Sequence, residues 1–107
     1  MAWLILILAG ALEVVWATAL KQSDGFNRLV PAVVMVTAAL ASLWLLALAM
    51  RALPLGTAYA VWTGIGAVGA FVVGIVWLGE AATPLRLVAA ALVLSGLVLF
   101  KLSEPAS

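Results

Sequence analysis

The sequence predicts an all-α membrane protein with four transmembrane helices, and three observations lead to this prediction. Hydrophobic residues make up 68% of the 107 residues, whereas soluble domains typically contain about 45–50% apolar residues. The apolar residues form four long runs, and each run is close to the ~20 residues that a helix needs to cross the hydrocarbon core of a bilayer. Short polar segments separate the runs. We therefore expect the lipid bilayer to cover most of the apolar surface.

Each run predicts one helix of a single transmembrane domain. The first run carries a single charge, Glu13. In the second run Pro31 falls in the first helical turn, where the missing N–H is not needed. Pro54 precedes the third run and Pro84 precedes the fourth, which are positions where proline commonly marks a helix boundary. The domain covers residues 1–107, and its helices are expected at about residues 2–20, 29–50, 57–78 and 85–102.

A secretory signal peptide is the alternative interpretation of the first run. Ala17, Thr18 and Ala19 have the small-x-small form of a cleavage site. The charged segment that normally precedes the apolar part of a signal peptide is missing, and Glu13 lies inside the apolar run. The sequence therefore favours a helix that stays in the membrane.

Composition excludes several classes of function. The formal net charge is +1, so no basic surface for nucleic acid is expected. The chain has no Cys and no His, which removes disulfides, thiol chemistry and the usual zinc sites. No pair of nucleophile and base and no set of metal ligands is visible, so we expect neither an enzyme nor a bound cofactor or metal. Any proton chemistry falls on a carboxylate, because histidine is absent.

Glu13 is the most informative residue of the sequence. An ionised side chain near the bilayer centre costs roughly 2.5–3.5 kcal/mol on insertion scales. A carboxylate at this depth therefore needs a partner, a bound proton or a function. The other charged residues lie in the connections or at helix ends: Lys21, Asp24, Arg28, Arg51, Glu80, Arg86, Lys101 and Glu104.

The positive charges are nearly balanced between the two sides of the membrane. One side would carry Lys21, Arg28 and Arg86, and the other Arg51, Lys101 and the amino terminus. Cytoplasmic loops normally carry the excess of Lys and Arg, so this balance indicates either one weakly preferred orientation or dual topology. Four helices leave little room for a solute pathway, and transporters often place their site between two inverted repeats. Two copies inserted in opposite senses would supply that symmetry, which predicts an antiparallel homodimer.

Candidate site residues surround Glu13 on the first helix. Gly10, Glu13 and Ala17 share one helical face, and Trp16 lies one turn from Glu13. Gly10 and Ala17 would let another helix or a ligand approach closely, although small residues also serve helix packing in membranes. Trp16 is too deep for the interfacial aromatic belt, so it either faces lipid or forms a wall of the site.

Further candidates lie on the second and third helices. Ser42 is a buried hydroxyl that either takes part in a site or donates to the carbonyl one turn earlier in its own helix. Tyr59 and Trp62 share a face of the third helix, either as an interfacial pair or as site residues. Gly64 and Gly66 are costly inside a helix and allow either close packing or a bend.

The candidate site residues occur within segments that resemble the small multidrug resistance family. These segments are AGALEVVWATALK around Glu13, GFNRLVP after the first helix, and SLWLLALAMRALPLGTAYAVWTGIGAVGA from Ser42 onward. The resemblance covers nearly the whole chain. Trp16 after Glu13 resembles the guanidinium-exporter subtype, since exporters of polyaromatic drugs have a small residue there.

The resemblance implies an antiparallel, dual-topology homodimer in the bacterial inner membrane. It implies proton-coupled antiport that exports guanidinium ion, with protons and the cation sharing Glu13 of both subunits. It also implies that the glycines matching Gly64 and Gly66 bend the third helix, and that the fourth helix mediates dimerisation. The residues around the glutamate in that subtype match Gly10, Trp16, Ser42, Tyr59 and Trp62, with Trp16 as a wall and the others in a hydrogen-bond network or packed beside the acid.

Two alternatives to guanidinium export stay open at this point. Apolar walls could admit an alkyl chain, which would make the protein a broad exporter of quaternary ammonium and other hydrophobic cations. The second alternative is a membrane protein that transports nothing, in which Glu13 pairs with a Lys or Arg of a different subunit. Comparing the binding of guanidinium with that of a tetra-alkylammonium ion separates guanidinium export from broad cation export. An obligate hetero-partner would indicate the protein that transports nothing.

Overall fold

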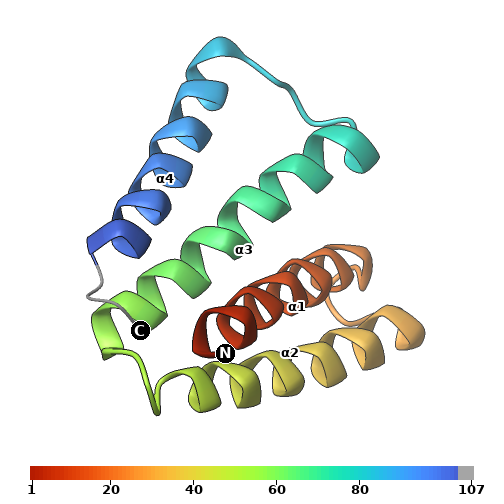
Figure 1. Ribbon diagram of the computed structural model, residues 1–107. Helices are drawn as coiled ribbons and strands as arrows, with labels where there is room; N and C mark the ends of the chain where they lie inside the picture. The colour runs from red at the N-terminus through yellow and green to blue at the C-terminus, as the bar shows by residue number, and fades with distance from the viewer. Residues whose placement is uncertain (104–107) are drawn as a thin grey trace.

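The computed structural model describes residues 1–103, and these residues form four α-helices without any strand (Figure 1). All four helices are long and apolar enough to span a membrane, which confirms the predicted all-α class with four transmembrane helices. The helices are α1 (Ala2–Gln22), α2 (Leu29–Ala49), α3 (Leu55–Leu78) and α4 (Pro84–Ser103).

Two helix ends differ from the predicted bounds by two residues. Helix α1 continues to Gln22, where the Ser23 amide donates to the Ala19 carbonyl at 2.8 Å and the Ser23 hydroxyl donates to the Leu20 carbonyl at 2.7 Å. Helix α3 begins at Leu55, because extended Pro54 precedes it and the Pro54 carbonyl accepts the first helical bond, from Ala58, at 2.9 Å. Capping of this kind satisfies backbone groups that a helix end leaves free.

The connection between α1 and α2 is a tight turn built on left-handed backbone. Asp24, Gly25 and Phe26 have φ values of 52°, 67° and 69°. Glycine adopts this region freely and aspartate tolerates it, whereas it is uncommon for other residues. The Ser23 hydroxyl accepts a hydrogen bond from the Phe26 amide at 3.2 Å, and the Ser23 carbonyl accepts one from Arg28 at 3.0 Å. These bonds hold the turn.

The order of the helices in space is α2, α1, α3, α4, which differs from their order in the chain (Figure 1). Helix α1 packs along both α2 and α3, while the backbone of α4 lies next to α3 alone. The centre of the packing is a cluster of side chains from α1, α2, α3 and the connection before α3, none of which lies in α4: Leu6, Ala9, Leu46, Ala49, Leu53, Ala58, Val61 and Trp62.

Helix α4 has no buried residue in the described chain. A five-residue connection, residues 79–83, joins it to α3. Arg86 holds this connection in place through three contacts. Its guanidinium lies 3.5 Å from the Glu80 carboxylate and donates to the Ala81 carbonyl at 2.7 Å. It also lies over the Phe71 ring, 5.3 Å from the ring centre. The ion pair is well exposed, so it contributes little stability on its own.

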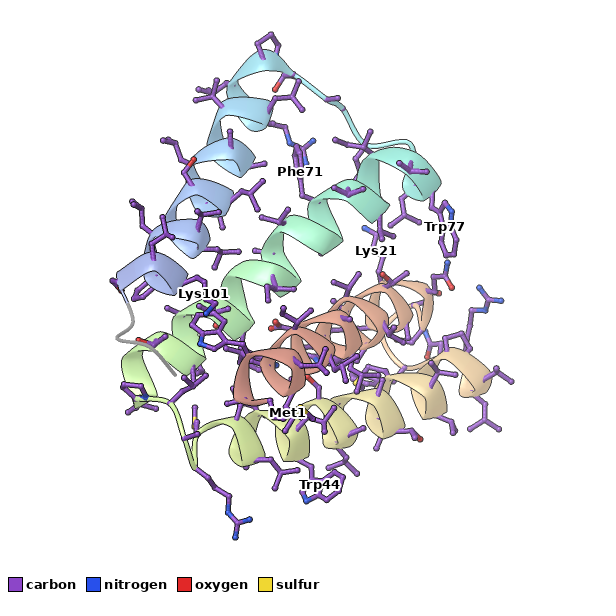
Figure 2. All side chains as sticks on the ribbon, viewed as in Figure 1. Met1, Lys21, Trp44, Phe71, Trp77 and Lys101 are labelled. Carbon is purple, nitrogen blue, oxygen red and sulfur yellow. The ribbon has the colours of Figure 1, made fainter. Side chains whose placement is uncertain are left out.

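Large apolar side chains also project outward from the other helices. Figure 2 shows Trp44 of α2 and Trp77 of α3 pointing away from the bundle, and they are 66% and 73% exposed. In water such a surface would drive association. Lipid, or lipid and a second protein chain, must therefore cover it.

Candidate functional site

Glu13 lies in the middle of α1, on the side that faces α3. Its side chain is half-buried, and its Oε1 atom is buried without a hydrogen-bond partner among residues 1–103. The carboxylate lies directly against Gly66 of α3: a methyl group built on Gly66 would overlap the Oε1 and Cδ atoms of Glu13. The acid therefore sits between two helices, in space that the absence of a side chain at Gly66 leaves free.

Helices α1 and α3 approach closely along the whole contact that contains Glu13. One turn before the acid, a methyl group on Gly10 would lie 2.5 Å from Ile65 of α3. Beyond Gly66, a methyl group on Gly69 of α3 would overlap Val14, the residue that follows the acid. Small residues let membrane helices come together in this way. The predicted role of Gly10 as a point of close approach to a helix agrees with this geometry.

Ser42 and Trp62 form a buried chain of hydrogen bonds that joins three helices. The Trp62 indole N–H donates to the Ser42 hydroxyl oxygen at 2.9 Å, and the Ser42 hydroxyl donates to the Ala9 carbonyl of α1 at 2.6 Å. Both side chains are buried. The Ser42 hydroxyl does not donate to its own helix, as many membrane serines do. Instead it fixes α2 and α3 to the α1 backbone one turn before Glu13.

The structure places Tyr59, a further candidate, beside Trp62. Tyr59 is half-exposed, and its ring centre lies 5.7 Å from that of Trp62 at an interplanar angle of 44°. A tilted pair at this distance is a favourable aromatic geometry. The bonds of Ser42 and Trp62 described above lead to Ala9 rather than to Glu13, so a hydrogen-bond network around Glu13 stays a prediction.

Trp16 carries a second buried polar group that lacks a partner. Its Nε1 atom is buried and makes no hydrogen bond with residues 1–103. Trp16 lies three positions after Glu13, so an unpaired donor and an unpaired acceptor occupy neighbouring turns of α1. Unpaired buried polar groups are uncommon in proteins. Trp3, near the start of α1, carries another such group, its Nε1 atom.

Gly64 and Gly66 lie at helix contacts, and α3 is continuous from Leu55 to Leu78. A methyl group on Gly64 would lie 2.5 Å from Leu97 of α4, and Gly66 faces Glu13. Close packing, one of the two predicted explanations for these glycines, therefore describes both positions. The predicted bend at Gly64 and Gly66 stays a prediction.

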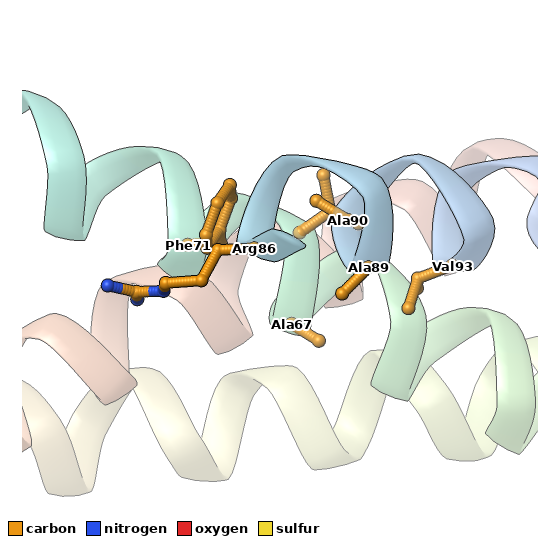
Figure 3. Close-up of a pocket in the computed structure, with 7 residues that line it drawn as sticks. Ala67, Phe71, Arg86, Ala89, Ala90 and Val93 are labelled. Atoms are coloured by element: carbon orange, nitrogen blue, oxygen red, sulfur yellow. The ribbon is translucent and has the colours of Figure 1, made fainter. Parts of the chain in front are cut away.

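One cavity lies between α3 and α4, and another lies between α1 and α3 and reaches the connection before α4. Figure 3 shows the first, of about 220 Å³, between α3 and α4, with Phe71 and Arg86 at one end and small alanines along its walls. The second, of about 340 Å³, extends from Ala17, one turn after Glu13, to Lys21, Glu80 and Arg86 near the helix ends. Within residues 1–103 no cluster of acidic side chains could hold a metal ion.

The sequence predicted the acid and its neighbours on α1, but it did not predict the bond from Ser42 to Ala9 or the contact between Gly66 and Glu13. The acceptor for Ser42 is a backbone carbonyl, which any residue at position 9 would supply, so no side chain signals it. The contact between Gly66 and Glu13 could not be predicted either, because a glycine in a membrane helix indicates close approach but does not indicate which group approaches.

Known proteins are similar to this chain over almost its full length. A family model described as Small Multidrug Resistance protein matches residues 1–101. A guanidinium exporter of Escherichia coli O6:H1 is 61% identical over 103 residues, which are 96% of this chain and 98% of the relative. A guanidinium exporter of Escherichia coli strain K12 is 60% identical with the same coverage. One of Yersinia pseudotuberculosis serotype I is 55% identical over 104 residues, or 97% and 100% of the two chains.

Proposed function

Because the chain belongs to the Small Multidrug Resistance protein family, we propose that it exports guanidinium ion across the bacterial inner membrane in exchange for protons. The protein is a multi-pass transporter of that membrane rather than an enzyme. The observation that carries the proposal is the carboxylate of Glu13, which lies at mid-helix in a membrane span with one oxygen unpaired. Relatives about 60% identical carry the printed name guanidinium exporter, which supports this substrate.

The chemistry of the acid suits the cation. Guanidinium is planar and presents parallel N–H donors, which match the two oxygens of a carboxylate in a bidentate arrangement. Binding would also neutralise a charge that is costly in hydrocarbon. The unpaired Oε1 of Glu13 offers an acceptor for one such bond.

Protons and guanidinium would compete for the same oxygens. The ionised Glu13 binds the cation, and the protonated Glu13 releases it. If the protein changes the side to which it opens only when either protons or the cation are bound, inward proton flow drives the cation outward. With two copies of Glu13 facing one site, the protons would leave in coupled steps that belong to the pair.

The neighbours of the acid would shape the site. Trp16 would form a wall and offer its unpaired indole N–H. Ser42, Tyr59 and Trp62 would complete the hydrogen-bond network when a second subunit and the cation are present. Gly64 and Gly66 would bend α3 as the protein changes the side to which it opens.

The functional unit we propose is an antiparallel homodimer. A single chain offers one acid within a membrane span, and no residue of α4 is buried. The balance of positive charges between the two sides supports insertion in both orientations. Two antiparallel copies would place two Glu13 side chains around one cation, and the exposed faces of α4 could pack against each other.

Transport by the purified protein tests the function. Proteoliposomes with an acidic interior are expected to accumulate radiolabelled guanidinium, because protons leaving the vesicle drive cation entry. A protonophore should remove the accumulation, and empty liposomes provide the background. Equal uptake with and without the proton gradient would contradict the exchange. Strong uptake of tetrapropylammonium with little uptake of guanidinium would favour export of quaternary ammonium ions instead.

Reporter fusions test the topology. Alkaline phosphatase is active only outside the cytoplasm and green fluorescent protein only inside it, so both fusions to the carboxyl terminus are expected to be active in a dual-topology protein. Replacing Arg51 by alanine should shift the ratio of the two signals, because the charge balance depends on few residues. Activity of one reporter alone would show a single orientation.

A further inference from the structure

Four of the five glycines in α3 face a neighbouring group, and only one of these groups is an acid within a membrane span. Gly64 faces Leu97 of α4, Gly69 faces Val14 of α1, and Gly74 faces Glu80 of the connection that follows α3. Gly66 faces the carboxylate of Glu13. The contact at Gly66 therefore differs from the other close contacts of α3, because the group that fills it is the Glu13 carboxylate, to which we assign transport.

A side chain at position 66 would displace the carboxylate rather than the helix. The atoms in the way are the Oε1 and Cδ atoms of Glu13, with Cγ 2.8 Å from the added methyl group. Glutamate has three rotatable bonds, so its end can swing aside while α1 and α3 stay in place. Alanine also has a higher helix propensity than glycine. A change at Gly66 should thus leave the fold intact and move the acid.

The contact at Gly69 has the opposite character. There the added methyl group meets a γ-methyl of Val14, whose β-branched side chain has one strongly preferred rotamer in a helix. The valine cannot swing aside, so the two helices must separate. Gly69 and Gly66 lie three positions apart on the same helix and face the same neighbour, which makes them a matched pair for experiment.

We propose that Gly66 is a positioning residue for transport: it leaves the space in which the Glu13 carboxylate rests against α3. The position of the acid relative to bound guanidinium then depends on the missing side chain at Gly66, in addition to any bend of the helix. This inference rests on the proposed function of Glu13. It assigns to Gly66 a contact with the substrate-binding group.

Three variants, G66A, E13D and E13D/G66A, test the proposal through guanidinium binding to the purified protein, measured by calorimetry. G66A is expected to weaken binding about tenfold or more, because misplacing a binding group by about 1 Å has effects of that size. Aspartate is one methylene shorter, so its carboxyl carbon takes the place of the Glu13 Cγ atom, 2.8 Å from the added methyl group, instead of the place of the Cδ atom, which overlaps that group. The displacement is therefore smaller, and G66A should weaken binding several-fold less in E13D than in the wild type, which is the rescue that a positioning role requires. Losses that multiply in E13D/G66A would overturn the proposal.

Thermal unfolding of the same proteins separates positioning from packing. G66A is expected to keep the unfolding temperature of the wild type, whereas G69A should lower it and retain guanidinium affinity within about threefold. G56A is the inert control, because nothing lies within 4 Å of an added methyl group at Gly56. If G66A destabilises the protein as much as G69A does, Gly66 is a packing residue and the proposal is wrong.

A titration without substrate distinguishes failure of this proposal from failure of the proposed function. The carboxyl carbon of Glu13 can be followed by NMR in protein labelled at glutamate and aspartate, with E13Q identifying the signal. The pH midpoint should move by roughly half a unit or more between wild type and G66A, and by less between E13D and E13D/G66A. Such a result supports the positioning role even if guanidinium does not bind. Unchanged midpoints in both pairs would overturn it.

Discussion

Replacing Glu13 with glutamine is expected to abolish proton-driven guanidinium uptake, with a loss of at least roughly 100-fold. Glutamine keeps the size of the protonated acid but carries no charge and cannot exchange a proton. Each hydrogen bond to a charged group contributes about 1.5–3 kcal/mol, so losing two such bonds to the cation costs ~3 kcal/mol or more. That free energy corresponds to about two factors of ten. Uptake of radiolabelled guanidinium into acid-loaded proteoliposomes measures the loss.

The control for E13Q is D24N, which removes a carboxylate from the connection between α1 and α2. Asp24 has a positive φ of 52°, and asparagine is among the residues that tolerate this backbone region. D24N should therefore transport like the wild type. Thermal unfolding should show that both variants fold. Strong, pH-dependent guanidinium uptake by E13Q would show that the acid is not the shared binding group.

The second large effect is expected for S42A, as a loss of stability. Alanine at position 42 leaves the Trp62 indole N–H buried without its acceptor and frees the Ala9 carbonyl. Hydrogen bonds between membrane helices have been valued at about 0.6–2 kcal/mol, and leaving a buried donor unpaired costs about 1–3 kcal/mol. We expect a loss of about 1–2 kcal/mol in the free energy of unfolding, measured by denaturation in mixed detergent micelles.

A double-mutant cycle attributes that loss to the chain of hydrogen bonds. W62F removes the indole donor while Ser42 still donates to Ala9, so W62F should cost less in the S42A background than in the wild type. S95A is the matched control, because Ser95 is exposed on α4 and donates to Ala91 of its own helix at 2.8 Å. Additive effects of S42A and W62F would contradict a shared network.

The four helices could be predicted from the sequence because the membrane imposes a simple rule. Backbone groups in hydrocarbon must be paired within the span, so a long apolar run has to be a helix. Predicted and observed ends agree to within two residues, and the two largest differences occur where Ser23 follows α1 and Pro54 precedes α3. The isolation of Glu13 was equally visible, since one charge in an apolar run stands out by itself.

The contacts of the site could not be predicted in the same way. The bond from Ser42 to Ala9 joins residues 33 positions apart and ends on a carbonyl that every residue carries. The neighbour of Gly66 depends on the rotation of α1 against α3, and weakly amphipathic membrane helices give little information about that rotation. The helical periodicity of the sequence correctly placed Gly10 and Glu13 on one face of α1. It did not indicate that α3 is the helix that covers this face.

The order of the helices in space has a consequence for how the chain is made. Helix α2 follows α1 in synthesis and packs on one of its flanks, but the cover for Glu13 comes from Gly66 of α3 on the other. A nascent chain that has delivered only two helices would leave this acid facing lipid, where an ionised carboxylate is costly. The third helix thus covers the one charge that lies deep in a membrane span, and a chain truncated before α3 should be degraded quickly by membrane proteases.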